Sequence, residues 1–209
     1  MDSTAKIVDC LQIAIAAAQA PERSKNQLQQ IIGLGMQQAL DYLYPHDQLS
    51  SQQVATVRDV YRQQYMASNA TPQRLFPGVR AMLDTLKSQG YQLSVATGKG
   101  RAGLEQAFAV SQLGAYFPIS RCASETRSKP DPLMLEEILC DFNMTPEHAV
   151  MIGDTQFDID MGKAAGMDTV AVAQGAHTKA QLQESLPLIV LEQIADLLSW
   201  LTDRPKLVH

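Results

Sequence analysis

The chain has 209 residues, of which 45% are hydrophobic and 19% are charged, with a formal net charge of -5. This composition is typical of a soluble globular protein of one or two domains. The sequence pI near 5.3 argues against a nucleic-acid-binding groove, which usually carries a basic surplus. No apolar run approaches the ~20 residues of a membrane span, which argues against a membrane partner. Three scattered cysteines without a CxxC pair fit free thiols and a cytoplasmic location.

The first third of the chain is predicted to be helical. Apolar residues recur at helical spacing over residues 3–18, and Pro21 ends that run. A second helical segment covers 27–44 and is interrupted at 33–35, and a third runs from 52 to 67. No strand pattern occurs before Pro72. These residues therefore predict an all-helical unit.

From residue 79 onward, helical and strand patterns alternate. Helices are expected at 79–88, 101–109, 132–142, 156–165 and 192–201. Short apolar runs at 91–96, 117–122, 149–152, 169–173 and 187–191 predict strands, the last of them an edge strand. This alternation is typical of a parallel sheet with helices on both of its faces.

Two carboxylates follow the predicted strand at 149–152. Asp154 comes directly after Gly153, and Asp158 lies within the first turn of the next predicted helix. Ligands bind at the carboxyl ends of strands in α/β sheets, and one or two carboxylates suit Mg2+. A surface turn with acidic helix-capping residues explains the pair equally well.

Two further sites lie after strands or in adjacent loops. Thr97-Gly98 combines a hydroxyl with exposed backbone N–H groups near a helix start, which suits a phosphate. Taken alone, a capping Thr with a turn glycine is the better explanation. Lys129, in Ser128-Lys129-Pro130, can point a fixed ammonium at a phosphate, although a lone Lys-Pro is more often exposed surface. His177 is interpreted as a solvated loop residue.

In order and spacing, these sites resemble the motifs of the haloacid dehalogenase superfamily, in its phosphoglycolate phosphatase and β-phosphoglucomutase branch. Thr97 matches the second motif, Lys129 the third, and Gly153-Asp154 with Asp158 the fourth. The resemblance implies a Rossmann-like parallel sheet core with a helical cap. It places the cap at 3–72, the core at 73–209 with 1–2, and Gly33 in a cap turn that faces the substrate.

The resemblance also assigns roles to these residues. Thr97, Lys129 and Asp158 are expected to be catalytic, and Asp154 and Asp158 to hold Mg2+. Thr97, Gly98, Lys129 and Gly33 are expected to bind the phosphate. The implied activity is a Mg2+-dependent phosphatase of small phosphorylated metabolites. A sugar-phosphate mutase shares every motif, while a dehalogenase does not need the Asp154 and Asp158 pair.

The first motif of the family, a strand that ends Asp-x-Asp-Gly-Thr, has no counterpart in the sequence. It supplies the nucleophile and the acid/base, and its strand lies at the centre of the sheet. An internal start or a truncation is the favoured explanation. Activity is therefore expected to be impaired, and a catalytically silent phosphate-binding module is the alternative. The missing strand would lie between the strands predicted at 91–96 and 149–152, and its loss would leave a slot with unpaired backbone groups. We expect these two strands to close up, or another segment or a second chain to fill the slot. The last case gives a reason to suspect a homodimer.

Overall fold

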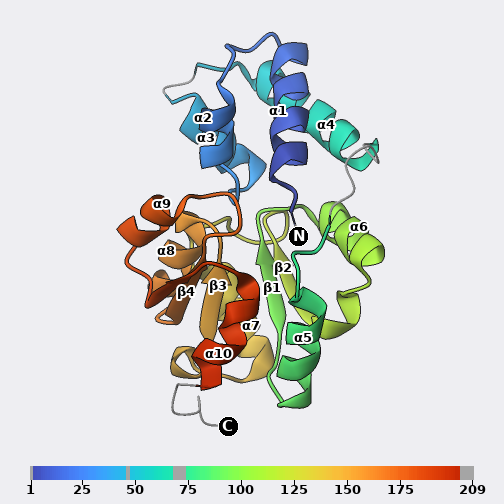
Figure 1. Cartoon of the computed structure of the whole chain (residues 1–209). Coiled ribbons are helices and arrows are strands. Elements are labelled where there is room, and N and C mark those ends of the chain that lie inside the picture. The colour runs from blue at the N-terminus through green and yellow to red at the C-terminus, as the bar shows by residue number, and fades with distance from the viewer. Residues whose placement is uncertain (1, 46–47, 68–73, 203–209) are drawn as a thin grey trace.

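Four helices form the first third of a computed structural model of the chain, which describes residues 2–45, 48–67 and 74–202 (Figure 1). These are α1 (Thr4–Ala17), α2 (Lys25–Gln30), α3 (Met36–Leu43) and α4 (Ser51–Ala67). In α1 the residues at helical spacing, Val8, Leu11 and Ile15, are buried. All four helices contribute to one hydrophobic cluster, whose buried residues lie between Val8 and Val57 in the chain. The helical prediction is confirmed, and the break at 33–35 separates α2 from α3.

Helices and strands then alternate, as the sequence predicts. The order is α5 (Val79–Ser88), β1 (Ser94–Thr97), α6 (Arg101–Ser111), β2 (Ile119–Cys122), α7 (Leu133–Phe142), β3 (Val150–Gly153), α8 (Gln156–Ala164), β4 (Asp168–Val172), α9 (Lys179–Glu184), β5 (Ile189–Leu191) and α10 (Leu197–Thr202), with short 3-10 turns at Gly114–Tyr116, Pro146–His148 and Ile194–Asp196. Helix α9 was not predicted. Its capping box, in which Thr178 and Gln181 bond reciprocally, is the sequence signal that marks its start.

All strand pairs are parallel, but the strands form two sheets. β1 pairs with β2, and β3-β4-β5 forms the second sheet. In the described part of the chain, no backbone hydrogen bond joins β1 to β3 and no segment lies between them. The expectation that these strands close up is therefore wrong, and no segment within the described ranges fills the slot. All four β1 residues stay partly exposed, whereas Thr169 to Val172 of β4 are buried.

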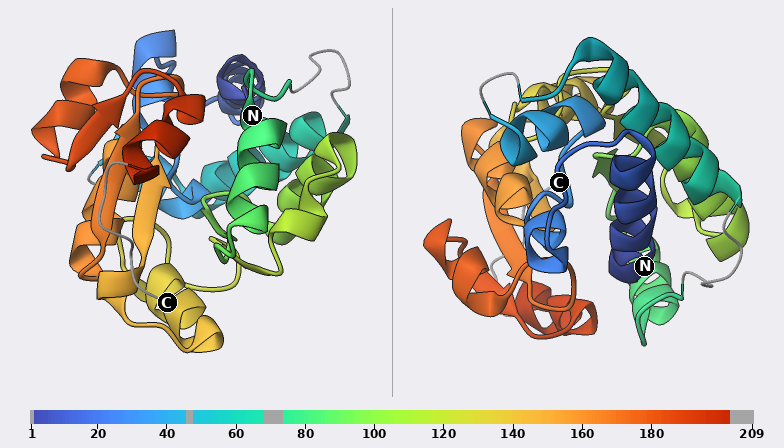
Figure 2. Two further views of the ribbon diagram at one scale, coloured as in Figure 1. Left: turned by 60° about the horizontal axis from the view of Figure 1, so that its bottom comes forward. Right: turned by 90° about the horizontal axis from the view of Figure 1, so that it is seen from above.

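The helices α1 to α4 lie over the end of the core at which β1 and β3 finish (Figure 1). Viewed from above, α1 runs beside α4, while α2 and α3 cover the other side of this end (Figure 2). The start of α1 lies at the junction of cap and core, and α10 lies toward the far end of the core (Figure 1). The expected domain boundary, between residues 72 and 73, lies outside the described residues. No helix in the described ranges is long and apolar enough to cross a membrane.

Candidate active site

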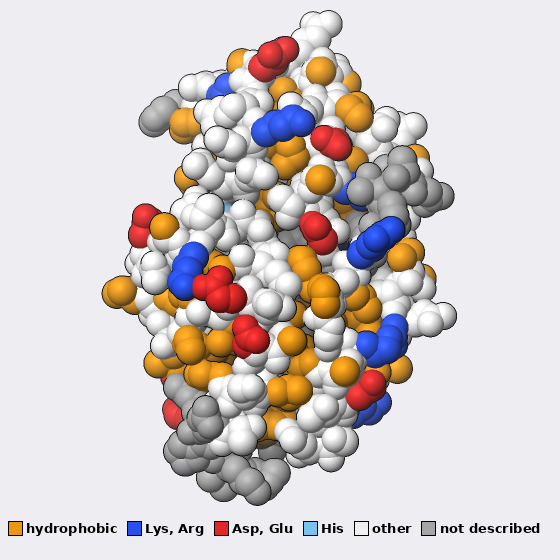
Figure 3. Space-filling model, viewed as in Figure 1, with side chains coloured by type: hydrophobic (Ala, Val, Ile, Leu, Met, Phe, Trp, Pro, Cys, Tyr) orange, Lys and Arg blue, Asp and Glu red, His pale blue; other side chains and the backbone are white. Residues whose placement is uncertain are grey.

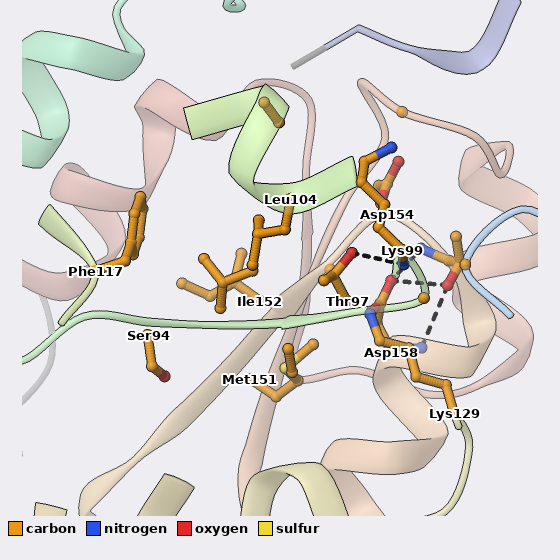
Figure 4. Close-up of a pocket in the computed structure, with 18 of the residues that line it drawn as sticks. Ser94, Thr97, Lys99, Leu104, Phe117, Lys129, Met151, Ile152, Asp154 and Asp158 are labelled. Atoms are coloured by element: carbon orange, nitrogen blue, oxygen red, sulfur yellow. Dashed lines mark hydrogen bonds and ion pairs between the residues drawn. The ribbon is translucent and has the colours of Figure 1, made fainter. Parts of the chain in front are cut away.

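Four of the predicted site residues gather at the cap-facing end of a large cavity. Figure 4 shows Thr97, Lys129, Asp154 and Asp158 together there, each from a different strand end, loop or helix start. This convergence follows from the parallel topology, because the carboxyl ends of parallel strands meet at one edge of the molecule. The remaining predicted residues, Gly98 and Gly33, line the same cavity.

Thr97 ends β1 and shapes the loop that follows. Its Oγ1 accepts a hydrogen bond from the N–H of Lys99 at 3.1 Å, which holds the loop in a tight turn. The residue that precedes α6 is Gly100, which makes no side-chain cap, so Thr97 is not the cap of that helix. The capping explanation of Thr97 is therefore wrong, and its hydroxyl lies at the cavity.

Lys129 and Asp158 form a buried ion pair. Their side chains are 6% and 5% exposed, and the Lys129 ammonium donates to Asp158 Oδ1. Asp158 Oδ2 accepts from the N–H of Thr155 at 3.1 Å and from its hydroxyl at 2.7 Å. Thr155 and Asp158 thus form a capping box at the start of α8. Both oxygens of Asp158 are occupied, and the carboxylate fixes the position of the Lys129 ammonium.

Asp154 is the second carboxylate at this edge. Its Oδ2 accepts a hydrogen bond from the N–H of Ala176 at 2.9 Å. Burial, and secondly the nearby charge of Asp158, raise the pKa of Asp154 above its usual range. A cation beside Asp154 would offset both effects. Among the described residues, no group of three or more His, Cys, Asp or Glu side chains is placed to hold a metal ion.

The cap turn between α2 and α3 packs directly on the loops of this site. The N–H of Gly35 donates to Ser128 Oγ at 2.6 Å, next to Lys129. A Cβ on Gly98 would lie 2.3 Å from the carbonyl oxygen of Gly33, so only glycine allows this approach. The turn, with Gly33 in it, therefore packs over the loops that carry Thr97 and Lys129.

His177 is 3% exposed, so the interpretation that it is a solvated loop residue is wrong. Its Nδ1 lies 3.1 Å from the N–H of Gln156, and because that group only donates, Nδ1 is the acceptor. Nε2 then carries the hydrogen and donates to the carbonyl of Gln30 at 3.2 Å. The neutral ring thus connects the start of α8 to the last residue of the cap helix α2.

Protonation of His177 would add a hydrogen to Nδ1 that faces the N–H of Gln156. Burial lowers the pKa of His177 in the folded chain, so the unfolded chain binds this proton more readily. Stability gained from the neutral ring is fully present above about pH 6.5 and is lost as the pH falls toward the folded pKa. We expect the urea midpoint to fall between about pH 7.5 and 5.5. His177→Gln should flatten the pH dependence of the urea midpoint. The same slope in His177→Gln as in the parent chain would contradict the assignment of this dependence to His177. The exposed His148 provides the control, since His148→Gln should leave the slope unchanged.

One contact at the site was missed by the sequence analysis. The Lys99 ammonium donates to the hydroxyl of Tyr65 at 2.7 Å, and this bond joins the β1 loop to the cap helix α4. Lys99 also lies 4.8 Å from the centre of the Tyr65 ring. No sequence pattern links two residues that are 34 positions apart, so this pair becomes visible only in the fold.

The chain has a parallel α/β core with helices over its strand ends, and a lysine and carboxylates lie beneath those helices. This arrangement defines the class of capped α/β enzymes. Within this class, the chain belongs to the haloacid dehalogenase-like hydrolase family, whose model matches residues 1–172. By family it is a hydrolase of phosphoric monoesters.

Individual relatives agree with this assignment. The chain is 28% identical to "Probable phosphatase IndB" of Dickeya dadantii over 200 aligned residues. The alignment covers 94% of this chain and 86% of the relative. It is 26% identical to phosphoglycolate phosphatase 1 of Pseudomonas aeruginosa over 203 aligned residues, and this alignment covers 95% of this chain and 74% of the relative. A solved structure of a hydrolase from Pseudomonas syringae matches with a TM-score of 0.87 at 20% identity, over 97% of this chain and 93% of that one. At that identity the structural match supports the fold alone.

Proposed function

We propose that this chain is built for Mg2+-dependent hydrolysis of small phosphorylated metabolites, as in phosphoglycolate phosphatases. The observation that carries the proposal is the convergence of Thr97, Lys129 and Asp154 beneath the cap turn (Figure 4). The Thr97 hydroxyl and the buried Lys129 ammonium supply a donor and a positive charge for phosphate oxygens. Asp158 acts as a positioning residue, because it fixes the ammonium through an ion pair. The cap turn at Gly33 limits the substrate to a small molecule.

Asp154 is the residue best suited to the metal. Mg2+ usually keeps several waters and is held by one or two carboxylates together with substrate phosphate oxygens, so it does not need a cluster of protein ligands. The N–H of Ala176 and the charge of Lys129 compensate the Asp154 carboxylate only in part, so its pKa stays raised and a cation beside it would favour the ionised form. Asp158 was also expected to bind the metal; its Oδ2 already accepts twice from Thr155 and its Oδ1 accepts from Lys129, so a metal at Asp158 would have to share Oδ1 with the ammonium. When bound, Mg2+ supplies positive charge that stabilises the phosphoryl group during transfer.

The described residues provide no aspartate nucleophile between β1 and β3. In the family's mechanism one aspartate attacks phosphorus and a second one transfers the proton of the leaving group. We propose, therefore, that residues 2–202 bind and orient a phosphate but turn it over poorly without an added strand. We also propose the division into a cap at 3–72 and a core at 73–209 with 1–2.

The test compares two proteins in Mg2+-dependent hydrolysis of para-nitrophenyl phosphate. One is the 209-residue chain, and the other carries in addition about 20 residues encoded upstream, enough for a strand and its connections. Activity in the longer protein alone supports the proposal. Equal activity in both would mean that another residue supplies the nucleophile, and the proposed mechanism would be wrong.

Asp154→Asn is expected to weaken Mg2+ binding by about 10-fold or more, because the variant loses the carboxylate charge that attracts the ion. Isothermal titration with Mg2+ in the presence of inorganic phosphate measures this change. Asp160→Asn is the matched control, since Asp160 is exposed on α8, the helix that follows Asp154, and the substitution should leave Mg2+ affinity unchanged. If Asp154→Asn bound Mg2+ like the parent, Asp154 would not be a metal ligand.

Two alternatives remain distinct from this proposal. A sugar-phosphate mutase needs a cap group that manages proton transfer at the sugar hydroxyl, and the cap turn at 33–35 presents only Leu34 between two glycines. A catalytically silent phosphate-binding module would keep Thr97 and Lys129 without turnover. The DNA upstream of the Met1 codon separates the cases: an in-frame strand that ends Asp-x-Asp-Gly-Thr favours the phosphatase, and a stop codon favours the silent module.

A further inference from the structure

One wall of the cavity that contains the candidate site is positively charged. Arg58 and Arg62 of α4 line the cavity from the cap, and Lys99 lines it from the loop that follows β1. The two arginines are four residues apart and so share one face of the helix, and Tyr65 continues that face three residues further on. In Figure 4, Lys99 lies at the same end of the cavity as Thr97. These three cations, here called the basic wall, therefore belong to the same cavity as the proposed phosphate site.

Contacts with Tyr65 hold Lys99 in the basic wall. The Lys99 ammonium donates to the Tyr65 hydroxyl at 2.7 Å and lies 4.8 Å from the centre of the ring. Tyr65 itself is 5% exposed, so its ring is a fixed support. The ammonium of Lys6, a buried residue of α1, lies 4.4 Å from the centre of the same ring. This second ammonium adds to the positive potential of the wall.

Nearby carboxylates do not offset these charges. Within the described ranges, no carboxylate oxygen lies within 4 Å of a charged nitrogen of Arg58, Arg62 or Lys99. Asp59 is the only acidic residue of α4, and it does not line the cavity. On the face of the molecule seen in Figure 3, by contrast, acidic and basic side chains are interspersed. A cleft wall of one sign attracts ligands of the opposite sign, so the basic wall is suited to an anion.

The spacing along the chain limits how far such an anion lies from the phosphate. Thr97 and Lys99 are two residues apart, so their Cα atoms are at most about 7 Å apart. A ligand whose phosphate contacts Thr97 therefore reaches the basic wall through a chain of a few bonds. Lys129 does not belong to this wall, because its ammonium is paired with Asp158.

We propose that the basic wall binds a second anionic group of the substrate. The chain then takes phosphorylated compounds that carry a carboxylate or another phosphoryl group a few bonds from the phosphate. The planar guanidinium of Arg58 or Arg62 can donate two parallel hydrogen bonds to either group, and the Lys99 ammonium can donate beside them. A neutral tail would leave all three cations without an anion. This inference rests on the proposed function for the placement of the phosphate, and it makes the two arginines specificity-determining residues.

Non-hydrolysable phosphonates test the proposal on the 209-residue chain, because binding is then measured without turnover. Isothermal titration in the presence of Mg2+ compares phosphonopropionate, which has a carboxylate at the far end of its chain, with its amide, which has the same shape and a neutral end. We expect the acid to bind at least about tenfold more tightly than the amide. Trimethylenediphosphonate distinguishes the two anionic groups. Tighter binding than that of the acid assigns the wall to a phosphoryl group, and weaker binding assigns it to a carboxylate.

Variants of exposed arginines show where the preference for the acid arises. Arg62→Gln should reduce this preference to less than about threefold and leave the affinity for the amide unchanged. Arg62→Lys keeps the charge without the planar fork and should keep part of the preference. Arg127→Gln is the matched control, since Arg127 is 73% exposed and does not line the cavity. It should leave the preference intact.

Equal affinities of acid and amide in the parent chain would overturn the basic wall and leave the proposed phosphate site in place. A preference that survives in both Arg58→Gln and Arg62→Gln, or that falls equally in Arg127→Gln, would also overturn it, because net charge would be the cause. Failure of the proposed function gives a different result: the amide would not bind, while the acid would still bind and depend on Arg62. Absence of binding by either compound would overturn both proposals.

Discussion

Lys129→Met is expected to lower the free energy of unfolding by about 3 to 5 kcal/mol, because it leaves the buried Asp158 carboxylate without its partner. Both side chains of the pair are almost fully enclosed, at 6% and 5% exposure. Methionine keeps most of the aliphatic stem of lysine, so the loss reports the charge more than the packing. Urea unfolding, followed by circular dichroism at neutral pH, measures the change.

The same substitution at an exposed ion pair provides the control. Lys179 pairs with Glu192, and these side chains are 50% and 65% exposed. Lys179→Met should cost less than about 1 kcal/mol. The double variant Lys129→Met with Asp158→Asn removes the unpaired charge and should recover part of the lost stability. Equal losses at the two lysines would show that Lys129 contributes packing alone, and its proposed role as a fixed ammonium would lose its support.

The alternation of helices and strands was predictable because local sequence patterns indicate each of these elements. The helix at Val79–Ser88 agrees with the prediction at both ends, since Gly78 precedes it and Gly90 follows. The strand ends at Thr97 and Gly153 follow from short apolar runs that stop at glycine-containing turns. Where the fold is parallel, strand ends share one edge, so the grouping of Thr97, Lys129 and Asp154 was also within reach of sequence reasoning.

Contacts between distant segments were not predictable in this way. His177 looks like an ordinary loop residue in the sequence, and it is buried because the cap carbonyl of Gln30 comes to its ring. The bond between Lys99 and Tyr65 likewise depends on where α4 lies. The strands β1 and β3 belong to separate sheets, although the expectation was that they close up. Whether two strands that are distant in the chain pair with each other is not encoded in any local pattern.

The contact between cap and core depends on the absence of a side chain at residue 98. A Cβ there would lie 2.3 Å from the carbonyl oxygen of Gly33 and 2.7 Å from that of Leu34. Both atoms belong to the backbone, so neither can move without moving the cap turn. Gly98→Ala is expected to lower the free energy of unfolding by about 1 to 3 kcal/mol, the usual cost of an added methyl group in a packed interior.

Gly100→Ala is the matched control, two residues further along the same loop. The nearest atom to a Cβ at this position is Ser124 Oγ at 3.7 Å, an ordinary contact, so the control should cost about 1 kcal/mol or less, mainly because Ala is a poorer N-cap of α6 than Gly. Amide hydrogen exchange of residues 31–35 distinguishes how the loss arises. Faster exchange there in Gly98→Ala, with β4 unchanged, would show that the cap turn has lifted from the site. Parent-like stability and exchange in Gly98→Ala would mean that the turn does not rest on Gly98, and the covered site described above would be wrong.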